Sequence, residues 1–228
     1  MSSIYNEKYI NITYPNKKST YPKKFCNYLF KKFPVGSKIL DIGCGNGEIA
    51  EELKKMNFNV YGIDINITSK KILNNNFKKT DIQKNKYPFP DNFFDIVFSK
   101  STIEHLKNPD FLINEAYRVL KPNGVFICLT PSWKHNYKEA FYIDHTHVTP
   151  FTRHSLEVIC KLSGFKANCD YFYQLPLFWK NKWMIIFIKL INLLNLPYKP
   201  FSKINWPENF NKFIRFSKEV MLICKSIK

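Results

Sequence analysis

Residues 38–47 have the sequence KILDIGCGNG, and this stretch decides the fold. Its first half is an apolar run typical of a buried strand, and three glycines spaced G-x-G-x-G follow directly. Glycine adopts positive φ and lets the backbone approach a ligand closely, and the N–H groups of a following helix attract a carboxylate or phosphate. The stretch therefore predicts a strand, a ligand-binding loop and a helix.

Asp64 follows the next apolar run, residues 58–63. A carboxylate at the tip of a second strand is placed to accept both ribose hydroxyls of an adenosine. A nicotinamide dehydrogenase would carry G-x-G-x-x-G, but here the third glycine comes one residue early and Glu48 takes the place of the last one. A dehydrogenase is therefore the weaker alternative.

On both sides of this loop, short apolar runs alternate with helical patterns. Strands are expected near residues 38–42, 59–64, 94–99, 124–130, 166–174 and 218–227. Helices are expected over residues 21–33, 48–56, 68–75, 109–120 and 151–164, the last with Thr152 as N-cap and Gly164 as stop. The alternation predicts an α/β fold with a Rossmann-like, doubly wound, mostly parallel sheet.

The composition is that of one folded unit. The chain has 228 residues, of which 45% are hydrophobic, enough for one sizeable core. We expect an N-terminal arm and helix over residues 1–35 and a single domain over residues 36–228. The six cysteines contain no C-x-x-C pair, and no basic segment followed by an apolar run opens the chain. These features favour a reduced, cytoplasmic protein without a structural zinc.

The formal net charge of +17 has three interpretations. Lysines and arginines gain affinity for nucleic acid by neutralising phosphates, and they also attract anionic lipid headgroups. Here the excess is mostly lysine, spread in doublets such as Lys31-Lys32 and Lys78-Lys79 that resemble solvated helix faces. We favour this last interpretation, so a nucleic-acid partner is the weaker alternative.

Four segments together resemble the class I S-adenosylmethionine-dependent methyltransferases, in particular domains of types 11 and 12. They are ILDIGCGNGEIAEEL, VYGIDIN, FDIVFSKSTIEHLKNPDFLINEAYRVLKPNGVFICLTP and FTRHSLEVICKLSGF, and they span roughly residues 36–174. The sequence departs from the family at Asn123, where a glycine is expected, and a turn tolerates Asn there. The resemblance implies a seven-stranded sheet and S-adenosyl-L-methionine as cofactor.

The resemblance also implies which residues hold that cofactor. The methionine part is expected on Asp41 and the glycine loop, with Ser99 and Lys100 beside it, the ribose on Asp64, and the adenine between Asp81 and Ile82. The full set of expected cofactor residues is Asp41, Gly43, Gly45, Asn46, Gly47, Asp64, Ile65, Asp81, Ile82 and Ser99.

Three histidines are candidate catalytic groups. Methyl transfer needs a positioned nucleophile and, for a hydroxyl acceptor, a base that removes its proton. His105 follows Glu104 after the fourth strand and is either such a base or a packing residue. His145 and His147 stand at i and i+2 in an extended stretch and point to opposite sides, so only one of them is expected to face the cofactor. We expect no metal, although a site at residues 144–147 is a weaker alternative.

The sequence after the fourth strand lacks two motifs, and their absence limits the classes of methyl acceptor. Residues 99–101 have the sequence SKS. Enzymes that methylate an amino group of adenine or glutamine would have an N-P-P-Y-like run here, and enzymes that make 5-methylcytosine through a cysteine would have a Pro-Cys. Neither motif is present, so both classes of acceptor are disfavoured. A hydroxyl or carbon centre of a small molecule, sugar or lipid-linked glycan remains. The alternatives are an RNA methyltransferase and a non-catalytic nucleotide or nucleic-acid binding module.

Residues 177–198 are the most apolar stretch, within a helical insertion expected over residues 176–213. Polar residues gather on one side of the helical wheel and apolar residues cover the other, but polar residues interrupt the run too soon for a membrane span. A lid over the substrate, a dimer contact and a helix lying on the inner face of the membrane all remain open, as does the oligomeric state. The wheel sets Lys182, Lys189, Asn192 and Asn195 against Trp183, Ile186, Phe187, Leu190, Ile191, Leu193 and Leu194.

Overall fold

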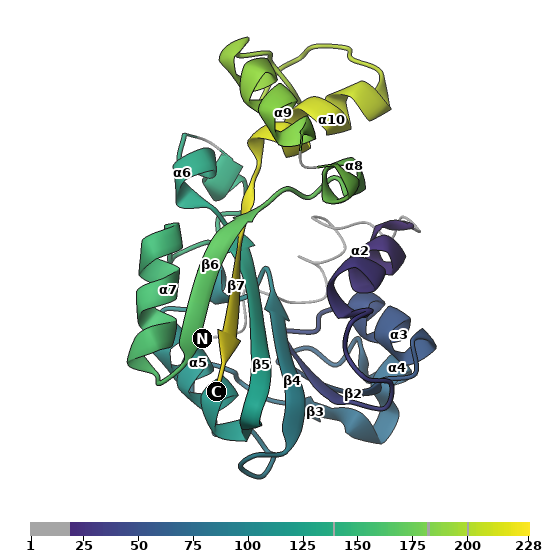
Figure 1. The fold of residues 1–228 in the computed structure, drawn as a ribbon, viewed down its shortest axis with the longest axis vertical. Helices are drawn as coiled ribbons and strands as arrows, with labels where there is room; N and C mark the ends of the chain where they lie inside the picture. Colours follow the sequence, from purple (N-terminus) through teal and green to yellow (C-terminus); the bar gives the residue numbers. More distant parts are fainter. Residues whose placement is uncertain (1–18, 139, 182, 200) are drawn as a thin grey trace.

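A computed structural model describes residues 19–138, 140–181, 183–199 and 201–228. The expected arm over residues 1–18 lies outside the described residues. One seven-stranded sheet forms the centre, helices cover both of its faces, and a group of helices stands above one end (Figure 1). The expected Rossmann-like α/β sheet is confirmed.

The strands are ordered β3-β2-β1-β4-β5-β7-β6 across the sheet. The first five strands in the chain pair in parallel, and β7 runs antiparallel to both β5 and β6. Because the strand order reverses beside β1, a crevice for ligands is expected at the carboxyl ends there. The strands are β1 (Lys38–Ile42), β2 (Asn59–Asp64), β3 (Phe77–Lys79), β4 (Phe94–Lys100), β5 (Leu120–Pro131), β6 (Lys166–Phe172) and β7 (Met221–Ile227).

Two buried cores lie on the two faces of the sheet. Phe25 and Leu53 belong to the core under α2 and α3, whereas Leu112 and Leu156 belong to the core under α5 and α7. Parallel strands covered on both faces are apolar throughout, which explains why each run in the sequence is continuous. The helices are α2 (Tyr21–Phe30), α3 (Glu48–Lys55), α4 (Lys70–Leu73), α5 (Pro109–Val119), α6 (Trp133–Asn136) and α7 (Arg153–Leu162), with 3-10 turns η1 (Asn74–Asn76), η2 (Ile103–His105) and η3 (Ala140–Ile143).

Most of the observed helix and strand boundaries agree with those predicted from the sequence, and the differences have local causes. Thr152 caps α7 by accepting a hydrogen bond from Ser155 N–H, and Gly164 takes φ of 98° after it, as expected. The helix expected over residues 68–75 shortens to α4, because Asn74 adopts φ of 51° at its end. The last strand begins at Met221, since a further helix runs up to Lys218.

The prediction of one helix over residues 177–198 is wrong. Two helices, α8 (Pro176–Lys180) and α9 (Met184–Leu193), are followed by α10 (Glu208–Lys218), and we call these three the appendage. The break falls at Asn181, which is extended and whose Oδ1 accepts the N–H of Trp183 at 3.1 Å. Among the described residues, no helix is long and apolar enough to cross a membrane.

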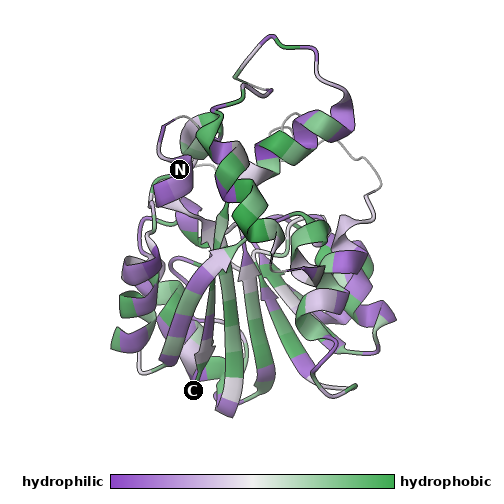
Figure 2. Cartoon of the chain, turned by 45° about the horizontal axis from the view of Figure 1, so that its top comes forward, coloured by the Kyte–Doolittle hydropathy of each residue, from purple (hydrophilic) through white to green (hydrophobic). Residues whose placement is uncertain are grey.

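The second helix of the appendage turns its apolar side outward. Trp183 is 78% exposed and Leu193 is 80% exposed, whereas Asn192 lies on the inner side and donates to Ser217 O at 3.2 Å. Only Ile188 is fully buried among the helix's described side chains. Figure 2 shows the hydrophobic colour both in the sheet and on the helices that stand above it.

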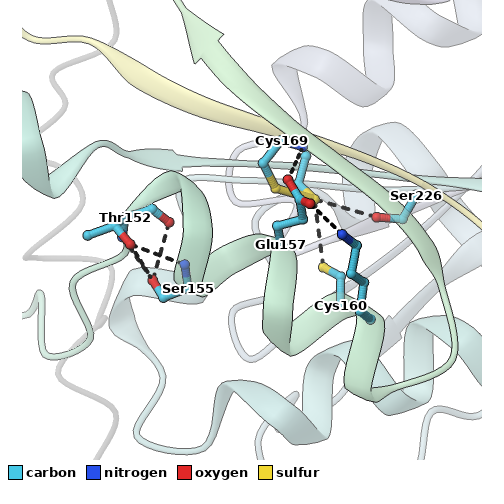
Figure 3. The surroundings of a disulfide bond; sticks show 8 residues. Thr152, Ser155, Glu157, Cys160, Cys169 and Ser226 are labelled. Atoms are coloured by element: carbon cyan, nitrogen blue, oxygen red, sulfur yellow. Dashed lines mark hydrogen bonds and ion pairs between the residues drawn. A yellow bond between two sulfur atoms is a disulfide. The ribbon is translucent and has the colours of Figure 1, made fainter.

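Two cysteines form a disulfide across the last two strands. Cys169 of β6 and Cys224 of β7 stand opposite each other in the antiparallel ladder and are bonded (Figure 3). Cys160 of α7 lies beside them, with its sulfur 3.9 Å from that of Cys224. The expectation of reduced cysteines is therefore wrong for this pair, because residues 55 positions apart in the chain become neighbours through the strand register. Four buried cysteines are free in the described residues.

Candidate functional site

The glycine loop between β1 and α3 leaves an open space beside Gly45. Gly43, Gly45 and Gly47 have φ of 72°, 50° and 79°, a region that side chains with a Cβ rarely adopt. A Cβ on Gly43 would collide with Thr102, and one on Gly47 would come within 2.8 Å of Ile72. A Cβ on Gly45 would meet nothing within 4 Å. The outer two glycines are thus needed for packing, and Gly45 borders room for a ligand.

Asp64 at the end of β2 closes one side of this space. Its Oδ2 accepts the N–H of Gly45 at 2.9 Å, and its Oδ1 accepts the N–H of Asn66 at 2.8 Å. Burial raises the pKa of Asp64 above its usual value, although these backbone hydrogen bonds oppose the shift. Ile65 follows and is 36% exposed at the same edge. The carboxylate therefore lies directly at the glycine loop.

Asp41 is a second buried carboxyl group in this region. Burial and then the nearby Asp64 raise its pKa to about 7, while Lys100 opposes the shift. Two buried carboxyl groups beside open space favour a cationic ligand, because an opposite charge stabilises their ionised forms. S-adenosylmethionine carries a sulfonium and an ammonium group, so the residues at this loop fit it.

The remaining residues expected to bind the cofactor differ in how far they are exposed. Asp81 and Ile82 follow β3 and are half-buried, and Asp81 Oδ1 accepts the N–H of Gln83 at 3.1 Å. Asn46 is half-buried within the glycine loop. Ser99 is fully buried, and its hydroxyl donates to the carbonyl of Ile42. Ser99 therefore joins β4 to β1 through its side chain.

Glu104, after β4, is a site residue whose importance the sequence did not reveal. It is fully buried, its Oε2 accepts from Thr130 Oγ1 at 2.9 Å, and its Oε1 has no hydrogen-bond partner among the described residues. Burial raises its pKa to about 7, and Lys100 is one of the groups that oppose the shift. Ser101, three residues earlier, has φ of 54°, which is rare for a residue other than glycine. An unsatisfied buried carboxyl oxygen calls for a functional explanation.

His147 lies next to His105, and one of its ring nitrogens has no hydrogen-bond partner among the described residues. The two rings are 4.6 Å apart. His147 Nδ1 lies 2.6 Å from the carbonyl oxygen of Phe141 and must donate, because a carbonyl only accepts. In neutral His147, Nε2 therefore carries the lone pair. Burial lowers the pKa of His147, which keeps the ring neutral near pH 7.

His105 is held from two sides. Its Nδ1 lies 2.9 Å from Thr146 Oγ1, and the backbone of Ser101 also hydrogen-bonds to it. Burial lowers its pKa to about 4. His145, by contrast, is exposed. The expectation of an extended stretch is wrong, because residues 144–147 form a turn in which His147 N–H donates to Asp144 O at 3.1 Å. This turn places the ring of His147 against that of His105.

Glu104, His105 and His147 are also the described residues whose arrangement most resembles a metal site, with ligand atoms within 4.8 Å of one another. The weaker sequence alternative involved Asp144 instead, but Asp144 accepts the N–H of Thr146 at 3.0 Å. Each of the three residues offers one possible ligand atom, and a catalytic zinc takes three protein ligands. Burial lowers the pKa of both histidines, and neutral rings of this kind also suit acid–base chemistry.

The comparisons with known proteins agree with this geometry. A family model described as a methyltransferase domain matches residues 15–169. The ubiquinone/menaquinone biosynthesis C-methyltransferase of Rickettsia bellii is 32% identical over 188 residues, which is 74% of this chain and 73% of that protein. The ubiquinone biosynthesis O-methyltransferase of Pelagibacter ubique is 30% identical over 99 residues, and these cover 41% of each chain. The chain thus matches less than half of the latter relative's length.

A solved structure shows the same fold. The S-adenosylmethionine-dependent methyltransferase of Archaeoglobus fulgidus superposes with a TM-score of 0.62 at 22% identity, covering 90% of this chain and 92% of that one. The sheet order and the glycine loop define the class I methyltransferase fold. With the family match over most of its length, the chain belongs to the S-adenosylmethionine-dependent methyltransferases.

Proposed function

We propose that this methyltransferase acts on a hydroxyl or carbon centre of a small molecule, sugar or lipid-linked glycan, with His147 as the general base. S-adenosylmethionine, when bound, supplies an electrophilic methyl group. The glycine loop and Asp41 would hold its methionine part, and Asp64 its ribose. Two of the relatives are named for C- and O-methylation, which supports this range of acceptors.

The free Nε2 of His147 carries the proposal. A base must be neutral and must have a lone pair directed at the acceptor's proton. The hydrogen bond to Phe141 fixes the tautomer, and burial keeps the ring neutral. As the acceptor attacks the methyl group, Nε2 would take its proton and Nδ1 would keep its own on the Phe141 carbonyl. His105 would act as a positioning residue, because its ring packs against that of His147.

Charged groups connect this base with the cofactor loop. Lys100 interacts electrostatically with Asp41 on one side and with Glu104 on the other. Glu104 in turn has a carboxylate oxygen within 4.8 Å of a ring nitrogen of His147. When His147 gains a proton, an ionised Glu104 would stabilise the imidazolium. This gives the unsatisfied oxygen of Glu104 a role in the proposed reaction.

We also propose that α9 contacts an anionic membrane surface. Its outward apolar face supports this, since Phe187 and Leu190 are 51% and 57% exposed in addition to Leu193 on the helix and Trp183 directly before it. Lys189 is exposed on the same helix, and the net charge of +17 favours anionic lipid. An apolar face with cationic residues at its margin is typical of helices that lie on a bilayer.

Labelled S-adenosylmethionine and fractionated extract test the acceptor class. The purified protein should move label into the lipid, polysaccharide or small-molecule fraction, and the Asp64→Ala variant should move none. Label that enters only RNA would contradict the proposal. A His147→Ala variant with full transfer would leave the acceptor class standing and remove the assigned base.

A further inference from the structure

A cavity of about 300 Å³ lies between the catalytic fold and the appendage. It is at the lower end of the size range of small-molecule sites. Residues from α6, from the carboxyl end of β6 and just beyond it, and from α9 form its walls. Figure 1 shows α6 and α9 above the end of the sheet at which β6 finishes. The lining residues are Lys134, His135, Asp170, Tyr171, Tyr173, Ile185 and Lys189.

The cavity lies at the carboxyl ends of the strands, on the half of the sheet away from the glycine loop. The glycine loop and Asp64 follow β1 and β2, whereas α6 follows β5, and β6 lies two strands further across the sheet. A methyltransferase must bring its acceptor to this edge from the side that the cofactor leaves open. The cavity is therefore placed to hold part of the acceptor.

Cations gather at this cavity. Lys134 and Lys189 line it and form no ion pair with a described residue. Lys134 Nζ lies 5.9 Å and Arg153 Cζ 5.7 Å from the centre of the Tyr171 ring. Burial and Lys134 lower the pKa of His135, so that ring is neutral. The lining thus has two positive charges.

Asp170 is the one negative charge of the lining. Its Oδ1 accepts the N–H of Tyr171 at 2.7 Å, which engages part of the carboxylate with the backbone. Two lysines against one carboxylate leave the lining positive, and Arg153 behind Tyr171 adds to this. Lysine ammonium groups are common phosphate ligands, and tyrosine hydroxyls can donate to phosphate oxygens.

We propose that this cavity binds a phosphate group of the methyl acceptor, with Lys134 and Lys189 as its cationic ligands. The inference rests on the proposed function, because it assigns the group to the acceptor. Lys189 lies on α9, one turn from Ile185 in the cavity wall, while neighbouring residues of the helix carry the exposed apolar face. A phosphate joined to a lipid chain would therefore place the chain along α9 and the phosphate between the lysines.

Binding of geranyl phosphate and of geraniol to the full chain tests the proposal. By calorimetry without methyl donor, the wild type should bind the phosphate more tightly than the alcohol. The Lys134→Gln/Lys189→Gln double variant should lose about tenfold or more of its affinity for the phosphate and should bind both ligands equally. Lys166→Gln is the matched control, since Lys166 is exposed at the opposite end of β6. Its affinities should equal those of the wild type.

Binding of glucose 1-phosphate shows whether the site takes the phosphate of a lipid-linked acceptor or that of a free phosphate ester. Equal, lysine-dependent binding of both phosphates would support the phosphate site and assign it to a free ester. The proposal would be overturned if the double variant kept wild-type affinity, or if neither phosphate bound. Calorimetry with S-adenosylmethionine, run on the same samples, separates this result from a failure of the proposed function, because cofactor binding does not involve the two lysines.

Discussion

Apolar side chains are buried in the half of the molecule that carries the glycine loop, whereas many of them are exposed in the appendage. We call the first region, which comprises β1, β2 and α3, the cofactor half. In α3, Ala50 and Leu53 are fully buried, while Lys55 lies in solvent and pairs with Glu51 at 2.9 Å. In α9, Phe187, Leu190 and Leu193 are more than half exposed, and polar Asn192 lies on the inner side. Burial within the fold accounts for the apolar side of α3, whereas the exposed apolar side of α9 is the surface proposed above to contact a membrane.

The largest expected effect is loss of cofactor binding in the cofactor half. Gly45→Val adds a branched side chain at positive φ and fills the open space beside the loop, and Asp64→Ala removes the carboxylate proposed to accept the ribose hydroxyls. We expect calorimetry to detect no S-adenosylmethionine binding by the first variant and greatly weakened binding by the second. Gly36→Val is the control, because Gly36 has φ of 83° and open space around it but precedes β1. Unchanged affinity in both folded variants would disprove the cofactor assignment.

The next largest effect concerns the base. His147→Ala should lower kcat by a factor of about 10² to 10⁴, the usual contribution of a general base. His145→Ala should leave it unchanged, since His145 is exposed. Burial lowers the pKa of His147, so the wild-type kcat/KM should stay constant until the pH falls below the ordinary histidine value of about 6.5. Equal rates for both alanine variants would contradict the assignment.

A third effect is a stability change at Glu104 that depends on pH. Its folded pKa of about 7 lies above the unfolded value, so wild-type stability falls as the pH rises from about 4.5 to 7. Glu104→Gln removes this penalty and should raise the free energy of unfolding by about 3 kcal/mol at pH 8, with little change at pH 4. Urea denaturation at both pH values measures the difference. A gain of equal size at pH 4 would show that charge is not the cause.

The smallest effect on stability is expected in the appendage. Replacing Trp183, Phe187 and Leu190 with serine should change stability by about 0.5 kcal/mol or less per site, because all three are exposed. The same change should abolish flotation with vesicles of phosphatidylglycerol and phosphatidylcholine, since apolar burial contributes about 25 cal/mol per Å². The control variant carries Val35→Ser and Leu162→Ser, which are 72% and 80% exposed elsewhere. Absence of flotation by the wild type at low salt would refute the membrane contact.

The cofactor half could be predicted from sequence because its signals are local. Three glycines and a following helix determine the loop, and Asp64 ends an adjacent strand in the same parallel order. The site around Glu104 could not be predicted in this way. Its burial depends on Thr130 and on the backbone of Val148, which donates to Glu104 O at 2.9 Å, and both come from later parts of the chain.

The appendage shows a different limit of sequence reasoning. Periodicity identifies the residues that share a face of α9, but it does not say whether that face turns toward the protein or away from it. The break at Asn181 depends on one side-chain hydrogen bond to the next turn, which composition does not reveal. The pairing of Cys169 with Cys224 depends likewise on strand register, which a scan for C-x-x-C spacing does not include.

The two ends of the appendage are neighbours in the sheet. Phe172, the last residue of β6, pairs with Met221, the first residue of β7. A short hairpin turn could join these two residues directly, so everything between them is an addition at one point of a ladder that does not need it. Loop-closure entropy changes only slowly with length. Segments of other lengths and sequences can therefore be accommodated at this point without changing the pairing of β6 with β7 or the glycine loop on the other side of the sheet.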